Sequence, residues 1–387
     1  MPVPGPLPRT SFGLPTRSAA APTVLVRRSP PGRRCCMSDD PPGAPRVSAI
    51  LPLHDPGPGL RSTIAALLAT LSAEDELVVV DDASGDGTAD LLRDTDWQGL
   101  PVQVVRLPER AGVAAARNHG LTRARGEMVW FVDWDDRWDP AIVGRLYAAR
   151  LASGAPVVGC GADLVDTRGR RREQLGEVTG PTLLTGGEIG IAILDGRIRG
   201  YLWNKLFARE VLGESPFPPR RTRSDFAGSA ELMARQPTVY LIPDLMFHHV
   251  QRPGSLTTVQ HPSLETLRES QRIGERVAAV ALAHPDGPAD PTAVAAALHE
   301  FRHREWHVAV AGTAMRAHHD PQDRAEWLRI ARDGLQLRAA VRLFPRDREL
   351  ALRVAVLAAL GAHYPLAYRA VLRVRPWVRR VTGRGRA

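Results

Sequence analysis

The chain has 387 residues, enough for two domains and a sizeable core, and its composition is that of a soluble globular protein. The net charge of +9 is concentrated at the two ends, because residues 1–46 hold seven Arg and two acids and residues 363–387 hold seven Arg and no acid. The middle of the chain is therefore slightly acidic, which argues against a central domain that binds nucleic acid. No run of about eighteen apolar residues occurs, so the sequence predicts no membrane-spanning helix.

Residues 1–45 contain eleven Pro and show no hydrophobic periodicity, so we expect a disordered N-terminal segment. They lack the apolar stretch of a signal peptide, and a translation start at Met37 is an equally simple interpretation. The cysteines are Cys35, Cys36 and Cys160, and two neighbours plus one isolated residue imply no disulfide framework. A reducing, cytoplasmic location is therefore expected.

From residue 47 onward, short apolar runs alternate with amphipathic stretches. In the first amphipathic stretch Leu60, Ile64, Leu67 and Leu71 recur at helical spacing and form one apolar face. This β-α-β-α-β-α-β order predicts an α/β fold with a doubly wound, mostly parallel sheet. The expected strands are 47–53, 76–80, 102–107 and 128–132, and the expected helices are 60–71, one that begins near residue 88, and 112–125.

A second half continues this alternation, with strands at 157–162 and 238–242 and helices at 187–194 and 224–234. From residue 262 onward only helical patterns occur. We therefore expect three parts. They are the disordered Pro- and Arg-rich segment 1–45, an α/β domain over 46–260, and a helical C-terminal domain with a basic tail over 261–387.

Two acidic clusters follow expected strands of the sheet. Asp81 and Asp82 follow the second strand, and Asp133, Asp135 and Asp136 follow the fourth. Ligands of doubly wound sheets bind beyond the carboxyl ends of the strands, so both clusters are candidates for one site. Neighbouring carboxylates repel one another, and a divalent cation that carries a phosphate would relieve that repulsion. The simpler alternative is an acidic loop that opens the next helix.

Four segments occur in a recognisable order: Val47-Ser-Ala-Ile-Leu-Pro-Leu-His54, Leu77-Val-Val-Val-Asp-Asp-Ala-Ser84, Gly112-Val-Ala-Ala-Ala-Arg-Asn-His-Gly120 and Phe131-Val-Asp-Trp-Asp-Asp136. Together they resemble the inverting family-2 glycosyltransferases of the GT-A fold, in their bacterial, non-processive form. The resemblance implies transfer of a sugar, expected to be UDP-linked, from a nucleotide donor to an acceptor hydroxyl with inversion. It also implies Mg²⁺ or Mn²⁺ as cofactor. The chain has no Q-x-x-R-W segment, the pattern of processive synthases.

The resemblance assigns the acids after the fourth strand to the metal. Asp135 is the expected metal ligand, Asp133 binds the ribose or the metal, and Asp136 is a third ligand. A cation between carboxylates and a diphosphate would neutralise the negative charge that develops on the leaving group.

The resemblance also assigns donor-binding residues. Asp82 is expected to accept a hydrogen bond from a uracil-type base, Pro52 and His54 to flank that base, and Arg117 to clamp a phosphate. The alternatives are a helix-capping loop for Asp82, a structural turn for Pro52 and His54, and a solvated helix position for Arg117.

Asp225 lies in the segment Arg223-Ser-Asp-Phe226 and is the expected base that takes the proton of the acceptor hydroxyl. The family usually carries Glu before this Asp, whereas this chain has Ser224, which puts the acceptor contact in doubt. An N-cap role for Ser224 or Asp225 is the alternative. The departure also motivates a second class of function, a catalytically silent relative that binds a nucleotide or a glycan.

The segment Tyr201-Leu-Trp-Asn-Lys-Leu-Phe207 resembles the family's W-x-K-L-F stretch and holds the only lysine of the chain. Lys205 could reach a donor phosphate or a sugar hydroxyl, and Trp203 could stack on the acceptor sugar. An amphipathic helix that buries Trp203, Leu206 and Phe207 is the alternative.

The segment Phe247-His-His-Val-Gln-Arg-Pro-Gly-Ser255 resembles the H/Y-x-x-R-x-x-S stretch that closes such enzymes over the donor. His249 is expected to bind the metal or the diphosphate, and Arg252 to clamp the diphosphate. Pro253 and Gly254 predict a segment that becomes ordered on donor binding, in the manner of a lid.

His299-Glu300-Phe-Arg-His303 satisfies the H-E-x-x-H pattern of zinc hydrolases, and His307 extends the row on a helix. A catalytic zinc needs a third protein ligand, for which the sequence offers no supporting context. A packed or solvated stripe of an ordinary helix is the alternative.

The C-terminal residues Val374, Trp377 and Val378 are interleaved with Arg, which predicts a basic amphipathic helix able to lie on an anionic membrane surface. A packed helix with a frayed basic tail is the alternative.

The expected partners are a nucleotide-sugar donor and a glycan or lipid-linked acceptor, without nucleic acid. The expected location is cytoplasmic, with peripheral contact at the inner face of the membrane as a second expectation.

Overall fold

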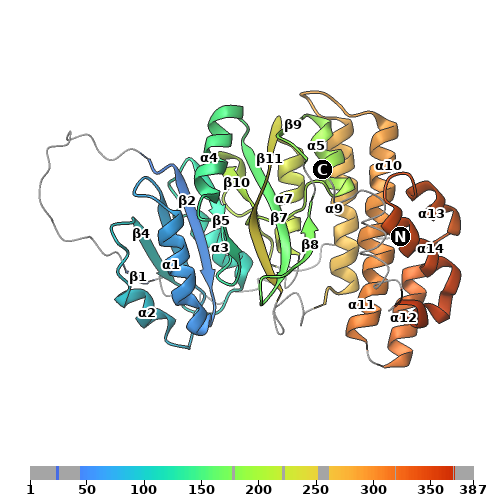
Figure 1. Cartoon of the computed structure of the whole chain (residues 1–387), viewed down its shortest axis with the longest axis horizontal. Helices are drawn as coiled ribbons and strands as arrows, with labels where there is room; N and C mark the ends of the chain where they lie inside the picture. The colour runs from blue at the N-terminus through green and yellow to red at the C-terminus, as the bar shows by residue number, and fades with distance from the viewer. Residues whose placement is uncertain are drawn as a thin grey trace, which may run out of the picture.

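The computed structural model describes residues 23–25, 44–176, 179–219, 223–251, 261–318, 320–368 and 370. Figure 1 shows a twisted central sheet with helices on both faces, followed by a wholly helical part at one end of the molecule. Across the described residues, no helix is long and apolar enough to cross a membrane.

The centre of the sheet is parallel, with neighbouring strands in the order β4, β3, β2, β5. These strands are Val102–Arg106, Glu76–Asp81, Val47–Leu53 and Met128–Phe131. Beyond β5, strand β10 (Lys205–Ala208) runs antiparallel and links β5 to β7 (Val157–Asp166), which pairs in parallel with β11 (Thr238–Gln251). Four short strands pair antiparallel with a neighbour: β1 (Thr23–Leu25), β6 (Arg137–Trp138), β8 (Arg171–Leu175) and β9 (Thr182–Thr185).

Strand β5 shows how a continuous apolar run builds both layers of the core. Met128 and Trp130 pack with the helices on one face of the sheet, whereas Val129 and Phe131 pack with the helices on the other. The first face carries α1 (Leu60–Thr70) and α4 (Ile142–Ser153), and the second carries α3 (Val113–Leu121), α5 (Gly187–Asp195) and α7 (Ser224–Ala234). Three short helices, η1 (Gly57–Gly59), α2 (Thr88–Asp94) and α6 (Arg209–Leu212), complete this part.

The helical part begins with α9 (Leu264–Leu282) and α10 (Pro291–Arg302), which share one hydrophobic cluster with α5 and α7. Gly274 allows α9 to approach α10 closely, because a Cβ at this position would lie 2.4 Å from the ring of Phe301. The elements that follow form two smaller clusters. They are the π-helical turn His303–Val308, α11 (Ala309–Ala317), α12 (Pro321–Arg332), α13 (Leu337–Leu343), α14 (Arg348–Leu360) and η3 (Gly361–His363).

The doubly wound α/β fold with a helical C-terminal region is confirmed, and all four strands expected in the first half are present. The helical alternative for residues 201–207 is wrong, because Lys205–Ala208 forms β10 in the middle of the sheet. Within the N-terminal segment, Thr23–Leu25 pairs with β4, and the expected disorder of residues 1–45 stays a prediction. A domain boundary at residue 260 stays a prediction, and it would cut through the cluster that joins α9 and α10 to the sheet.

Candidate active site

The carboxyl ends of β2, β3 and β5 meet at one edge of the sheet, because these adjacent strands are parallel. The pairing of β2 with β5 ends at Ile50, two residues before Pro52. Proline has no N–H to continue the ladder, so the two strands separate here. The acidic loop that begins at Asp133 starts at this separation.

Arg117 of α3 lies between two of the predicted site residues. Its Nη2 donates to Oδ1 of Asp133 at 2.7 Å and its Nη1 donates to Oδ1 of Asp225 at 2.5 Å, with only 3% of the Arg117 side chain exposed. Burial alone would lower the pKa of Arg117, but the two carboxylates outweigh burial and raise the pKa above its ordinary value. Arg117 therefore joins the acid at the end of β5 to the acid on α7.

Asp225 lies in the first turn of α7 and is partly exposed. Its Oδ1 accepts hydrogen bonds from Arg117 and, at 3.3 Å, from the hydroxyl of Ser224. No described residue donates a hydrogen bond to its Oδ2. Among the described residues, one oxygen thus has donors and the other has none, which is the geometry that a general base requires. Ser224, which stands where the family usually has Glu, supports this carboxylate directly.

The residue that starts α7 has an unusual backbone conformation. Arg223 has φ of 60°, in the left-handed region that costs a non-glycine residue about 1–2 kcal/mol. Its Nη1 donates to Oε2 of Glu305 at 2.5 Å, and Glu305 belongs to the π-helical turn His303–Val308. Burial alone would raise the pKa of Glu305, but three nearby arginines lower it to about 2. An ion pair from the helical part therefore holds the residue that leads into Asp225.

Asp136 is buried and faces strand β11. Nδ1 of His249 lies 2.9 Å from Oδ1 and 3.1 Å from Oδ2 of Asp136, and the N–H of Val250 donates to Oδ1 at 2.8 Å. Burial raises the pKa of Asp136. Burial alone would lower the pKa of His249, but Asp136 outweighs it and raises this pKa. Because Nδ1 is engaged, Nε2 is the ring nitrogen that His249 can offer to a ligand.

Trp203 lies beside this histidine within the core. Its ring stacks with Tyr201, Phe247 and His249 at centroid distances of 4.7, 4.3 and 5.7 Å, and only 3% of the residue is exposed. These contacts make Trp203 a support for His249. The geometry does not support the expected stacking of Trp203 on an acceptor sugar.

Asp82 and His54 lie at the ends of β3 and β2. The two carboxylate oxygens of Asp82 accept the backbone N–H groups of Ala111 and Gly112 at 2.6 and 2.8 Å. Nδ1 of His54 lies 2.8 Å from the carbonyl oxygen of Asp82. Asp82 therefore fixes the loop that precedes α3, the helix that carries Arg117. This anchoring corresponds to the capping alternative, although the helix concerned is α3 and not α2.

Lys205 is buried beneath the site, and its amino group faces protein acceptors. Nζ donates to the carbonyls of Arg199 and Tyr201 at 2.9 and 2.8 Å and to Oδ1 of Asn204 at 2.8 Å. Burial lowers the pKa of Lys205 to about 7. The structure thus gives Lys205 a role in fixing the backbone before β10.

The sequence of this chain is similar to those of known glycosyltransferases. The model of the glycosyl transferase family 2 matches residues 48–207. The putative teichuronic acid biosynthesis glycosyltransferase TuaG of Bacillus subtilis (strain 168) is 30% identical over 196 residues, which cover 51% of this chain and 75% of TuaG. This chain belongs to glycosyl transferase family 2.

One further relative and one solved structure are similar to this chain. The uncharacterized glycosyltransferase EpsJ of Bacillus subtilis (strain 168) is 24% identical over 59% of this chain and 67% of EpsJ. The crystal structure of S. aureus TarS 1–349 in complex with UDP-GlcNAc superimposes with a TM-score of 0.60 at 18% identity. That superposition covers 84% of this chain and 92% of TarS 1–349, and it confirms the GT-A fold.

The side chains of this family-2 protein fit a divalent metal. Asp133 and Asp135 are half-buried carboxylates beyond β5, and Asp136 orients His249 so that Nε2 is available. A carboxylate behind a ligating histidine is a recurring feature of metal sites. Within the described ranges, no group of three or more His, Cys, Asp or Glu side chains is placed so that it could hold a metal ion. A cation bound here would need further oxygen ligands, such as those of a bound diphosphate.

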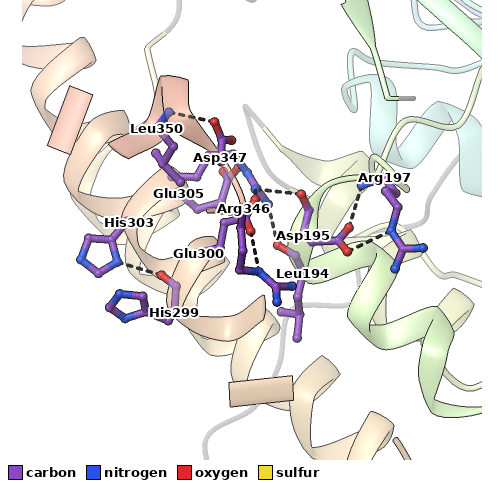
Figure 2. A network of polar contacts seen from close by, with 11 residues as sticks. Leu194, Asp195, Arg197, His299, Glu300, His303, Glu305, Arg346, Asp347 and Leu350 are labelled. Atoms are coloured by element: carbon purple, nitrogen blue, oxygen red, sulfur yellow. Dashed lines mark hydrogen bonds and ion pairs between the residues drawn. The ribbon is translucent and has the colours of Figure 1, made fainter. Parts of the chain in front are cut away.

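The H-E-x-x-H stretch does not resemble a zinc site. Figure 2 shows Glu300 on the side of Arg346, away from the imidazoles of His299 and His303. The carboxylate of Glu300 lies 3.4 Å from Nη1 of Arg304 and 3.5 Å from Nε of Arg346. Nδ1 of His303 is bonded to the carbonyl of His299 at 2.8 Å. Glu300 therefore holds arginines, and it is not placed to activate a water between the two histidines.

Sequence reasoning missed the contribution of the π-helical turn. Arg304 caps the end of α5, because its guanidinium donates to the carbonyls of Leu194 and Asp195 at 2.6 and 3.1 Å. The next residue, Glu305, holds Arg223. A π-helical turn has no periodic signature, so the only available signal was the density of charge beside the H-E-x-x-H stretch. Three predictions lie outside the described residues: the clamp Arg252, the lid-like segment at Pro253 and Gly254, and the basic helix beyond residue 370.

Proposed function

We propose that this chain transfers a sugar from a nucleoside-diphosphate donor, UDP-linked by preference, to an acceptor hydroxyl with inversion. The observation that carries the proposal is the contact of Arg117 with both Asp133 and Asp225. It brings the acid expected beside the donor close to the acid expected to act as base. Family membership supplies the class of reaction.

On the donor side, we assign the ribose and the metal to Asp133 and the metal to Asp135. We assign the uracil-type nucleotide base to Asp82, whose carboxylate also accepts the backbone N–H groups of Ala111 and Gly112. Because both oxygens of Asp136 face His249, we assign Asp136 to orienting that histidine, while Nε2 of His249 faces the metal or the diphosphate. Mg²⁺ or Mn²⁺ bound here would neutralise the charge that develops on the leaving diphosphate.

On the acceptor side, Asp225 accepts the proton of the attacking hydroxyl at Oδ2. The acceptor oxygen forms the new bond to the anomeric carbon as the bond from that carbon to the diphosphate oxygen breaks. The electron pair of the broken bond leaves with the nucleoside diphosphate. Arg117 and Ser224 hold Oδ1, so the carboxylate cannot rotate away from the acceptor.

We further propose that the acceptor is a cell-surface glycan or its lipid-linked precursor. The support is the similarity to TuaG, whose name refers to teichuronic acid biosynthesis. Such an acceptor, and the donor nucleotides, would place the enzyme in the cytoplasm or at the inner face of the membrane.

Asp225→Asn tests the assignment of the base. We expect turnover of a UDP-sugar with a cell-wall glycan fraction to fall by about a hundredfold or more, because the amide cannot take the proton. Binding of UDP with Mn²⁺ should stay within about twofold, because Asp225 lies on the acceptor side. Glu231→Gln, on the same helix, is the matched control and should leave both quantities unchanged. Unchanged turnover in Asp225→Asn would remove Asp225 from the mechanism.

A further inference from the structure

Helix α13 (Leu337–Leu343) and the residue after it expose an apolar stripe, which we call the α13 patch. It consists of Leu337, Val341 and Phe344, which are 56%, 72% and 55% exposed. Their spacing of four and three residues places them on one face of a helix. Exposed large apolar side chains usually occur singly on soluble proteins, so a row of three indicates a surface that meets a partner.

The opposite face of α13 is already packed. Ala339, Ala340 and Leu343 are buried in one cluster with residues of α14. The helix therefore has apolar side chains on two faces, although the fold of the described residues covers only one. A surface helix that serves the fold alone needs a single apolar stripe.

Arginines lie within and beside the α13 patch. Residues 337–348 contain four Arg and one acid. Arg338 and Arg342 are exposed, and neither forms an ion pair with a described residue. Arg348 lies 5.4 Å from the ring centroid of Phe344. Arginines that flank exposed leucine and phenylalanine are typical of a helix that lies in the interface of an anionic membrane.

Charge and area decide between a membrane and a second copy of the chain. A symmetric dimer through the α13 patch would bring arginines against arginines. Three side chains also fall well short of the roughly 800 Å² that each partner buries in a stable interface. An anionic lipid surface fits both the small area and the positive charge of the α13 patch, since it accepts a small apolar insertion and attracts each nearby arginine.

We propose that the α13 patch docks the protein onto a membrane surface that contains anionic lipid. Figure 1 shows α13 at the end of the molecule opposite β4 and α2, so docking through it leaves the sheet uncovered. This inference goes beyond the proposed transferase activity and does not depend on it. It also rests on different residues from the expected basic helix beyond residue 370.

Vesicle flotation of the full chain tests the proposal. The probes are vesicles of phosphatidylcholine alone and vesicles with about one third phosphatidylglycerol. We expect the wild type to float with the anionic vesicles and to bind the neutral ones at least about tenfold more weakly. The triple variant Leu337→Ser, Val341→Ser, Phe344→Ser should bind the anionic vesicles at least about tenfold more weakly than the wild type. Arg338→Gln with Arg342→Gln should weaken binding by about fivefold for each arginine.

The matched control replaces three exposed leucines elsewhere, Leu151, Leu183 and Leu282, which are 68%, 48% and 43% exposed, by Ser. It should float like the wild type, and thermal melting should show that all variants are folded. The proposal is overturned if the wild type does not float or if the α13 triple variant floats equally well, in which case another segment binds lipid. It is also overturned if the wild type sediments as a dimer that the triple variant dissociates.

Discussion

Arg117 is the residue on which the candidate site depends, because it is buried and holds two partly exposed carboxylates. Removing the buried guanidinium would leave two carboxylates without a positive partner, which lowers the free energy of unfolding more than the loss of a surface ion pair does. A neutral residue here would leave Asp133 and Asp225 to repel each other. Arg117 should therefore affect stability as well as activity.

Arg117→Gln should lower the free energy of unfolding by about 3 kcal/mol at pH 7, measured by urea denaturation. The control Arg93→Gln removes the pair with Asp90, whose side chains are 52% and 71% exposed. It should cost less than about 1 kcal/mol. Equal losses in the two variants would mean that the Arg117 contacts do not stabilise the fold.

The π-helical turn His303–Val308 is the element that links the helical part to the site. It directs Arg304 to the carbonyls that end α5 and Glu305 to Arg223 at the start of α7. π-helical turns are rare and occur frequently at functional sites. The helical part is therefore expected to position Asp225, the proposed general base, in addition to covering the core.

Glu305→Gln tests this link through the pH dependence of stability. The pKa of Glu305 is lowered from 4.5 to about 2, so its contribution is complete above pH 4.5 and is lost as the pH falls towards 2. The variant should unfold about 3 kcal/mol more easily than the wild type at pH 7, with little difference near about pH 2. The control Glu275→Gln, at a pair with Arg302 in which both side chains are about half exposed, should cost less than about 1 kcal/mol.

The kinetics of Glu305→Gln should separate positioning from a purely structural effect. We expect kcat to fall by about tenfold while the KM for the donor stays within about twofold, because Arg223 loses its restraint and the donor residues keep theirs. A parallel loss of donor affinity, or an unchanged kcat in a destabilised protein, would assign Glu305 to the fold alone.

Elements with local periodicity could be predicted from the sequence, whereas β10 could not. The runs at β2, β3, β4 and β5 are long enough to show strand character, and the helices between them show one apolar face. Strand β10 has four residues, and Leu206 and Phe207 pack on opposite faces of the sheet. Such a short apolar run is compatible with a helix or with a buried strand, and only the neighbouring strands β5 and β7 select the strand.

At the scale of the whole molecule, the site is built from segments far apart in the chain. Arg117 comes from α3 and Asp225 from α7. Asp136 follows β5, whereas His249 lies in β11. The sequence singled out the candidate residues, because each lies in a local motif, and their roles stay predictions. It could not indicate that Arg117 bridges two acids, that Asp136 holds His249 or that Lys205 is turned inward, since those contacts depend on how distant segments pack.

The most direct test of the central claim is a calorimetric titration of the purified chain with UDP, GDP and dTDP, each with Mn²⁺ or with chelator. We predict that a nucleoside diphosphate, UDP by preference, binds only in the presence of the metal. Asp135→Asn should weaken that binding at least about tenfold, whereas Asp94→Asn, an exposed acid at the end of α2, should not. Binding of none of the three nucleotides, or binding that neither chelation nor Asp135→Asn affects, would contradict the account.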